Sequence, residues 1–149
     1  MKSFLLKGKK PIIRWSLLPN EVYFEGNVPD GYNLAVSPWG YDGYIVLDVD
    51  RHDGGKDGFD SIPFHLKDEL DKTYHYKTKS DGMHFWFRYT GNKPLGNKSS
   101  GVGIDLRTNK GYVVWYPKED IRDVVKSGKI NDTSEDLNKW LEKLFSYVD

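Results

Sequence analysis

Two aspartates, Asp48 and Asp50, lie one residue apart at the end of the strand-like run "GYIVLDVD". Side chains of a strand alternate between the two faces of a sheet, so both carboxylates point the same way from one strand. Like charges this close repel each other unless protons or a cation intervene. Carboxylate oxygens are hard ligands that suit Mg²⁺ or Mn²⁺, so the pair is a candidate metal site.

Simpler interpretations of the pair stay open at this point. Asp50 could begin a turn, and Asp48 could cap a helix or pair with a lysine. A calcium-binding EF-hand is excluded, because Asp53 stands where that loop needs a glycine and Phe59 where it needs a glutamate.

Two later segments repeat the pattern of one apolar and one polar face. In "HFWFRY", His84 shares a face with Trp86 and Arg88, and in "GIDLR", Asp105 shares a face with Arg107. If these strands neighbour the first one, three carboxylates and several cationic groups converge, which is typical of two-metal phosphoryl- or nucleotidyl-transfer sites. Singly, His84 could be a structural histidine, and Asp105 could form a surface ion pair of little energetic value.

The elements that must position these residues are mostly strands followed by helices, which indicates an α+β or mixed α/β domain. We predict strands at residues 21–26, 33–38, 43–50, 84–89, 103–107 and 112–116, with a loop at 51–58. We predict helices at 61–70, 119–128 and 133–148, the last beginning with a capping box from Thr133 to Asp136. One face of that last helix is an apolar core stripe of Leu137, Trp140, Leu141, Leu144, Phe145 and Val148.

The composition sets outer bounds on function. The 149 residues favour one domain over 1–149, and 22 basic against 22 acidic residues exclude a strongly basic coat. The basic residues Lys2, Lys7, Lys9, Lys10 and Arg14 nevertheless cluster before the first acid. The absence of cysteine excludes a disulfide scaffold and a cysteine-based zinc site. No segment has the ~18 apolar residues of a membrane span, so we expect a soluble, cytoplasmic protein without a membrane partner.

Four blocks in order resemble the bifunctional primase-polymerase domain of the archaeo-eukaryotic primase superfamily, as found in phage and plasmid replication proteins. They are "GKKPIIRW" (8–15), "NLAVSPWGYDGYIVLDVD" (33–50), "TKSDGMHFWFR" (78–88) and "GVGIDLRTNKGYVVWYP" (101–117). The resemblance implies a catalytic core at 8–117 and a C-terminal helical segment at 118–149. It implies a central, mostly antiparallel sheet with helices packed on one face.

Site residues follow from the same resemblance. It implies that Asp48, Asp50 and Asp105 are the catalytic metal ligands for Mg²⁺ or Mn²⁺. It implies nucleotide contacts by His84, by the turn that contains Ser80 and Gly82, and more loosely by Arg107 and Lys110. The chain departs from the family at two glycine positions, where it has Asp81 and Lys110.

The activity that the resemblance implies is template-directed addition of nucleotides, as a DNA primase, a DNA polymerase or both. The implied partners are a single-stranded or primed DNA template and nucleoside triphosphates, and a replicative helicase is a further candidate. The basic N-terminus could track the template backbone, and Trp39 or Tyr41 could stack on a base.

Two other functions remain as alternatives. A D-x-D glycosyltransferase also places two aspartates after an apolar strand, but it does not require the blocks around His84 and Asp105. A non-catalytic nucleotide- or single-strand-binding replication accessory could use the same core. The presence of all three carboxylates favours the enzyme.

Overall fold

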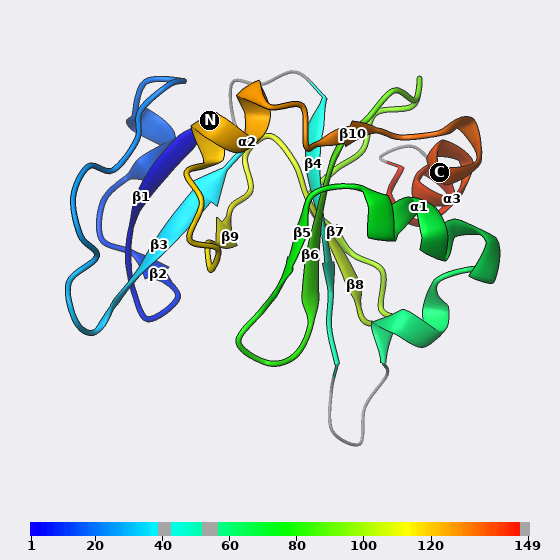
Figure 1. Cartoon of the computed structure of the whole chain (residues 1–149), viewed down its shortest axis with the longest axis horizontal. Coiled ribbons are helices and arrows are strands. Elements are labelled where there is room, and N and C mark those ends of the chain that lie inside the picture. The colour runs from blue at the N-terminus through cyan, green and yellow to red at the C-terminus, as the bar shows by residue number, and fades with distance from the viewer. Residues whose placement is uncertain (39–42, 52–56, 147–149) are drawn as a thin grey trace.

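The strands of the chain form two sheets in the computed structural model, which describes residues 1–38, 43–51 and 57–146 (Figure 1). The smaller sheet has the order β2 (Lys10–Pro11), β1 (Lys2–Lys7), β3 (Tyr32–Ser37), β9 (Val113–Val114). The six-stranded sheet has the order β10 (Asn131–Asp132), β6 (Met83–Arg88), β4 (Tyr44–Val49), β8 (Ile104–Arg107), β7 (Lys98–Ser99), and β5 (His75–Lys77) also pairs with β6. The pairings are antiparallel except for β10 with β6, so the predicted α+β class with mostly antiparallel strands is confirmed, although the strands are divided between two sheets.

Two helices cover one face of the six-stranded sheet. Ile45, Leu47 and Val49 of β4 point to this face and pack in one buried cluster with residues of α1 (Lys67–Lys72) and α3 (Glu135–Phe145). An isolated helix of 11 residues is marginal in water. Burial of an apolar side chain contributes about 1.5–3 kcal/mol, so α3 is held by its packed stripe more than by helix propensity.

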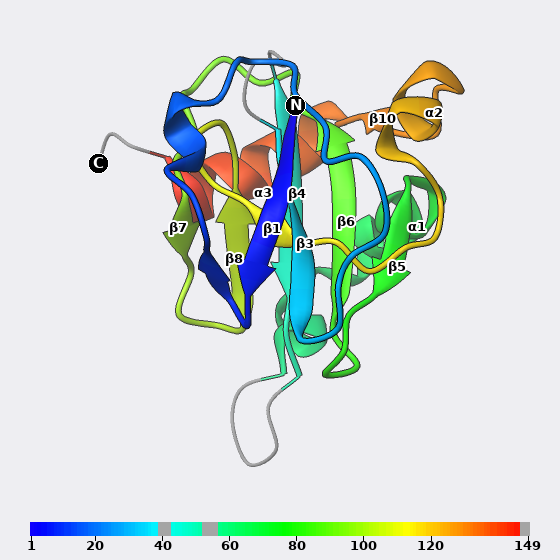
Figure 2. The ribbon, with the colours of Figure 1, turned by 90° about the vertical axis from the view of Figure 1, so that its left-hand side faces the viewer.

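The opposite face of this sheet packs against the smaller sheet. Val46 and Trp86 belong to a second buried cluster with Val36 and Val113 of the smaller sheet. Figure 2 shows β1 and β3 in front of the strands of the larger sheet. Helix α2 (Ile121–Lys126) adds two buried side chains to the same cluster. The polar ends of β4, β6 and β8 therefore face a second layer of protein.

The first strand of the smaller sheet was absent from the sequence-based prediction, and the strand predicted at 21–26 is wrong. Strand β1 pairs along its length with β3, whereas Val22 makes only an isolated bridge to Lys2. In place of a ladder, the backbone N–H of Phe24 donates to the Ser3 hydroxyl at 2.7 Å. The strand pattern of "KSFLLK" is hard to recognise in the sequence because the charged Lys2 occupies a buried position. Its Nζ atom donates to the backbone oxygen of Ser16 at 3.1 Å.

The helix predicted at 61–70 is broken by a proline. The chain forms two 3-10 turns, η2 (Gly58–Ser61) and η3 (Phe64–Leu66), before α1. Ile62 and Pro63 between them have ψ values of 123° and 137°. Ile62 is extended because the residue before a proline avoids the helical region. A third 3-10 turn, η1 (Trp15–Leu17), follows β2.

The cap of α3 also differs from the prediction by one residue. The Ser134 hydroxyl accepts a hydrogen bond from the Leu137 N–H at 3.1 Å and is therefore the N-cap. Thr133 is buried and bonds Thr90 and Asn138 instead. The core stripe is present over Leu137, Leu141 and Phe145, while Val148 lies outside the described residues.

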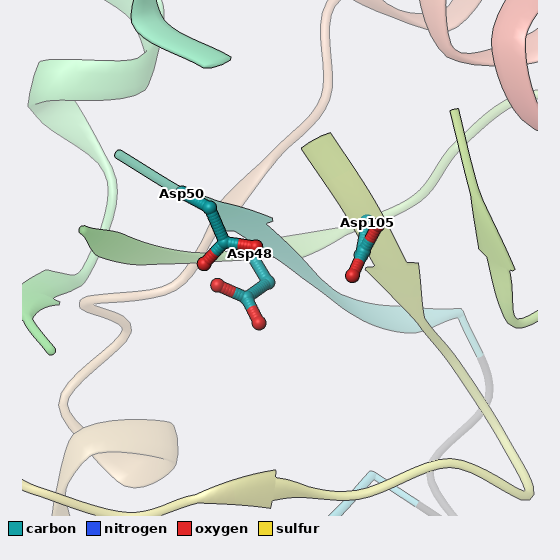
Figure 3. Close-up of side chains that lie close together, drawn as sticks. All are labelled: Asp48, Asp50 and Asp105. Atoms are coloured by element: carbon teal, nitrogen blue, oxygen red, sulfur yellow. The ribbon is translucent and has the colours of Figure 1, made fainter. Parts of the chain in front are cut away.

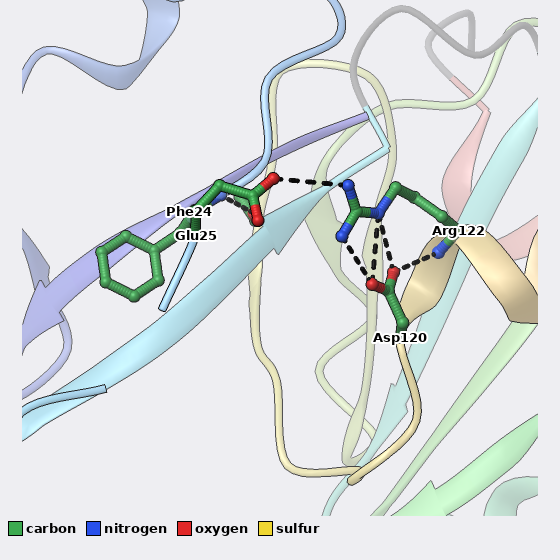
Figure 4. Close-up of polar contacts among 5 residues, drawn as sticks. Phe24, Glu25, Asp120 and Arg122 are labelled. Atoms are coloured by element: carbon green, nitrogen blue, oxygen red, sulfur yellow. Dashed lines mark hydrogen bonds and ion pairs between the residues drawn. The ribbon is translucent and has the colours of Figure 1, made fainter. Parts of the chain in front are cut away.

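An arginine on α2 connects the helix to the segment between η1 and β3. The Arg122 guanidinium donates to the Asp120 carboxylate at 2.6 Å and to the Glu25 carboxylate at 3.4 Å (Figure 4). It also lies 4.8 Å above the centre of the Tyr23 ring. Asp120 is at the same time the N-cap of α2, through a bond from the Arg122 N–H at 2.8 Å.

None of the described helices is long and apolar enough to cross a membrane.

Candidate functional site

The central strand β4 places Asp48 directly opposite a polar residue on each neighbouring strand. The antiparallel register pairs Asp48 with His84 of β6 on one side and with Asp105 of β8 on the other. All three side chains lie on the face that points to the smaller sheet, because their apolar neighbours in sequence belong to the cluster on the helix side. The pairing of strands thus gathers residues that are far apart in the sequence.

Asp48, Asp50 and Asp105 form a compact cluster of carboxylates (Figure 3). One oxygen from each lies within 4.8 Å of the others. The side chains of Asp48 and Asp105 are each 23% exposed, so water screens their mutual repulsion only partly. A set of three hard carboxylate donors matches the ligand chemistry of a divalent cation such as Mg²⁺ or Mn²⁺.

The Arg107 guanidinium and the His84 imidazole, one on each side of the cluster, lower its electrostatic cost. The Nε2 atom of His84 lies 3.4 Å from Oδ1 of Asp48, and an Arg107 nitrogen lies 3.6 Å from Oδ2 of Asp105. Burial raises the pKa of Asp48, but the contact with His84, a hydrogen bond with Asp50 and the charge of Arg107 together bring that pKa below its ordinary value. The Asp48 carboxyl is therefore ionised at neutral pH.

The orientation of His84 is set by a hydrogen-bonded chain of side chains. Trp86 donates its indole N–H to the Tyr76 hydroxyl at 3.1 Å, and the same hydroxyl lies 3.1 Å from Nδ1 of His84. An indole can only donate, so the Tyr76 oxygen accepts from Trp86 and its O–H is free to donate to Nδ1. That assignment leaves the proton of neutral His84 on Nε2, which faces Asp48.

A cleft of about 570 Å³ between the two sheets contains the cluster. Seven of the eight predicted site residues line it: Asp48, Asp50, Ser80, His84, Asp105, Arg107 and Lys110. Gly82 does not line the cleft. A glycine is needed at this position because a larger side chain would collide with its neighbours. A Cβ atom on Gly82 would lie 2.6 Å from the backbone oxygen of Val49 and 3.0 Å from the Thr78 hydroxyl. The glycine thus allows the turn to lie close to the end of β4.

Both departures from the family's glycines occur at left-handed backbone positions. Asp81 has a φ of 62° and Lys110 a φ of 79°, and they alone have this conformation among the described non-glycine residues. Glycine adopts this conformation without steric cost, so the backbone keeps the shape that a glycine favours. Asp81 is exposed and does not line the cleft, so its charge is not added to the cluster.

Several residues that the sequence-based analysis did not select also line the cleft. The Arg51 guanidinium is held 4.5 Å above the Phe59 ring and 3.8 Å from the Asp57 carboxylate. Other lining residues not selected for the site are Thr78, Asn97, Gly111, Tyr112, Val113, Val114 and Tyr116, together with Lys9 from the basic N-terminus. Arg51 was detectable as a cation directly after the second aspartate, whereas Tyr116 was hidden in the apolar run "YVVWY".

Other polar residues on the predicted face are not brought to the site. Arg88, at the far end of β6, lies 3.7 Å from Asp132 and does not line the cleft. The predicted stacking residues Trp39 and Tyr41 lie outside the described residues, as do residues 52–56 of the predicted loop.

Comparison with known families gives one match that covers most of the chain. A family model described as bifunctional DNA primase/polymerase, N-terminal, matches residues 9–140. The matched range contains all three carboxylates and every residue that lines the cleft. No curated protein matches the chain.

Proposed function

The chain belongs to the bifunctional DNA primase/polymerase N-terminal domain family, and we propose on this basis that it is a template-directed nucleotidyltransferase. The proposed activity is that of a DNA primase, a DNA polymerase or both, acting in phage or plasmid replication. We propose that residues 1–149 form one catalytic domain, with its core at 8–117 and a C-terminal helical segment at 118–149.

The observation that carries this proposal is the carboxylate cluster in a cleft that also holds cationic side chains. Three acidic oxygens within 4.8 Å of one another suit a metal, while His84, Arg107 and Lys110 in the same cleft suit an anionic substrate. A nucleoside triphosphate bound with a divalent metal needs both kinds of group at once. A purely acidic cleft would repel the triphosphate, and a purely basic cleft would not bind the metal.

Asp48, Asp50 and Asp105 would hold the metal ions, Mg²⁺ or Mn²⁺. Bound metals in such sites lower the pKa of the attacking hydroxyl and neutralise charge on the leaving group. The 3′ hydroxyl loses its proton to water and its oxygen forms a bond to the α-phosphorus. The bond from that phosphorus to the bridging oxygen of the β-phosphate breaks, and pyrophosphate leaves. The aspartates serve this reaction by remaining ionised, which the groups around Asp48 favour.

The cationic residues would orient the triphosphate. Arg107 offers a planar group that can donate two hydrogen bonds to phosphate oxygens, and Lys110 adds a mobile charge. His84 lies 3.4 Å from Asp48, which is longer than a strong charge-assisted bond, so its N–H can also serve a phosphate beside Asp48. The Ser80 hydroxyl lines the same cleft and can donate to the triphosphate.

The template would follow the exposed cations at the N-terminal turn. Lys7, Lys9, Lys10 and Arg14 are exposed, and Lys9 also lines the cleft, so a strand that enters the cleft would pass this turn. Lys2 is excluded from this role because it is buried. Contacts with phosphates make binding weaken as salt rises, by a slope of about 0.9 per neutralised phosphate on duplex DNA and 0.7 on single strands. A replicative helicase is a further proposed partner.

A primer-extension and de novo priming assay tests the proposal. Wild-type protein is expected to extend a primed DNA template with deoxynucleotides in Mg²⁺ or Mn²⁺. Asp48→Asn should abolish the product, because the amide keeps the size of the side chain and removes its charge. Asp71→Asn on α1 is the matched control, since Asp71 is exposed and does not line the cleft, and it should retain full activity.

The same assay separates the alternatives. A wild-type protein that binds nucleotide and single-stranded DNA but makes no product on any template would be a replication accessory. A protein that consumes a nucleotide-sugar instead would be a glycosyltransferase, and the replication proposal would be wrong. If Asp48→Asn retains activity, the carboxylate cluster is not required for the reaction.

A further inference from the structure

The proposed reaction determines where the nucleoside part of the substrate must lie. The attacked phosphorus is the α-phosphorus, and the sugar is joined to that phosphate through a single oxygen. If the metals are held by the three aspartates, the sugar lies beside them and the base lies farther along the same cleft. The inference below therefore rests on the proposed function and deepens it.

Tyr116 lies in the cleft where such a nucleoside could pack. Its ring centre is 6.3 Å from that of His84, at an angle of 40° between the rings, and His84 is in turn 3.4 Å from Asp48. Tyr116 is 37% exposed, although it lines the cleft. Its hydroxyl makes no hydrogen bond to another described residue. Burial and the charge of Asp48 raise the pKa of Tyr116, so the hydroxyl remains a donor at neutral pH.

The other two cleft residues with rings are already engaged in the fold. His84 is 4% exposed and is held between Tyr76 and Asp48. Tyr112 donates its hydroxyl to the backbone oxygen of Lys9 at 3.0 Å, and its edge packs against Phe4 and Trp15 at 5.6 Å from each. Of the two tyrosines that line the cleft, Tyr116 is the one whose hydroxyl has no hydrogen bond among the described residues and whose ring contacts only that of His84 among them.

The preceding residue holds Tyr116 in place. Trp115 packs against Tyr76 and Trp86, with ring centres 5.3 Å and 5.8 Å away, and its backbone N–H donates to the Leu34 backbone oxygen at 2.7 Å. The backbone at Tyr116 is thus fixed by the core on one side. A rigid aromatic side chain loses little conformational entropy when a ligand packs on it.

We propose that Tyr116 is the residue against which the nucleoside part of the bound nucleotide packs. Every base has an aromatic face, so stacking on a tyrosine ring is tolerant of sequence, as a template-directed enzyme requires. Alanine substitution of such a stacking residue typically weakens binding about 5- to 140-fold. The phosphates remain with the metal and cationic residues, so the contributions of Tyr116 and of the triphosphate site are separable.

Calorimetric titration of the full chain with dATP and with inorganic tripolyphosphate, both in Mg²⁺, tests this assignment. Tyr116→Ala should weaken dATP binding about tenfold and leave tripolyphosphate binding unchanged. Tyr116→Phe should bind dATP as the wild type does, because it keeps the ring. Phe64→Ala removes a ring that is 89% exposed and does not line the cleft, and it should change neither affinity.

The outcomes distinguish this inference from the function on which it rests. Wild-type dATP affinity in Tyr116→Ala would overturn the inference and leave the nucleotidyltransferase proposal intact. Equal weakening of dATP and tripolyphosphate would also overturn it, since Tyr116 would then act on the phosphates or on the fold. Absence of dATP binding by the wild type would contradict the proposed function, and the inference about Tyr116 would then also be wrong.

Discussion

Asp48 lies directly opposite Asp105 in the antiparallel pairing of β4 with β8. Directly opposed like charges destabilise a sheet, and here both residues lie on the same partly buried face. The arrangement has a local electrostatic cost that is relieved in part by His84 and Arg107. A bound divalent cation would relieve the remainder, which makes metal binding and folding stability linked quantities.

The first prediction concerns this linkage. In EDTA, the free energy of unfolding of Asp105→Asn should be about 0.5 kcal/mol higher than that of the wild type. The variant is more stable because the charge opposite Asp48 is removed. With Mn²⁺ at about 100 times the dissociation constant, the wild type should gain about 2.7 kcal/mol, and Asp105→Asn should lose most of that gain. Thermal melts with and without Mn²⁺ measure both effects. An equal Mn²⁺-induced gain in the two proteins would show that Asp105 is not a ligand.

A second prediction concerns the hydroxyl that orients His84. Tyr76→Phe leaves Nδ1 of His84 and the indole N–H of Trp86 without their partner, which should cost about 1–3 kcal/mol of stability. We also expect roughly tenfold lower nucleotide incorporation, as an unanchored His84 would lose its orientation toward Asp48.

The matched control for Tyr76→Phe is Tyr89→Phe. This variant also loses a hydrogen-bonded hydroxyl, which in the wild type contacts Glu142 at 2.8 Å and the Lys93 oxygen at 2.7 Å. Tyr89, however, packs on the helix side of the sheet, away from the cleft. This variant should lose stability and keep its activity per folded molecule. A Tyr76→Phe protein with unchanged incorporation per folded molecule would reduce Tyr76 to a structural role.

The third prediction concerns a left-handed residue in the turn before β6. Asp81 has a φ of 62°, so Asp81→Gly should raise the free energy of unfolding by about 0.5 kcal/mol, as glycine adopts this conformation without strain. Lys79→Gly in the same turn is the control, because Lys79 lacks a positive φ and glycine there adds only freedom to the unfolded chain. Urea unfolding compares the two. Destabilisation by Asp81→Gly would mean that the Asp81 side chain makes a stabilising interaction.

The fourth prediction gives a pH dependence. The hydrogen bond from Arg122 holds the pKa of Asp120 below its ordinary value of 3.8. A carboxyl with a lowered folded pKa stabilises the protein above the unfolded pKa, and that contribution is lost as the pH falls through the folded value. Asp120→Asn keeps the helix cap and removes the charge, so it should cost about 0.5 kcal/mol at pH 7, a modest value because the ion pair is exposed to solvent.

Unfolding free energies measured between pH 7 and pH 2 check this expectation. The difference between the wild type and Asp120→Asn should be constant down to about pH 4 and vanish below the folded pKa. Asp120→Ala should show an additional, pH-independent loss of about 1 kcal/mol from the missing cap. A constant difference between wild type and Asp120→Asn across the whole range would contradict the ion-pair account.

The alternation along individual strands was readable from the sequence. The residues that flank Asp48 and Asp105 are apolar, and the period of two places those carboxylates on the opposite face, as the structure has them. The residue types indicated a metal and phosphate chemistry for the same reason. The direction of a side chain along a strand and its chemistry depend only on the residue and its immediate neighbours, so both can be predicted from the sequence.

Longer-range features left weaker local signals. Strand β1 is stabilised by pairing with β3, about 30 residues later, and its buried Lys2 made the segment look like a solvated basic arm. The segment 21–26 has a strand-like composition, but within the described part of the chain it pairs only through one bridge, from Val22 to Lys2. Which segment joins a sheet depends on partners elsewhere in the chain, and composition alone does not specify the partner.

The sequence by itself determined the types of side chain in the cluster, the face on which each lies and the family to which the chain belongs. Only the tertiary structure decided that β4 lies between β6 and β8, with Asp48 opposite both His84 and Asp105. It also decided that Tyr116, from the end of an apolar run, lines the cleft while Gly82 does not. The physical reason is that distances across a sheet are set by backbone pairing between remote segments, whereas the sequence records only the order along one strand.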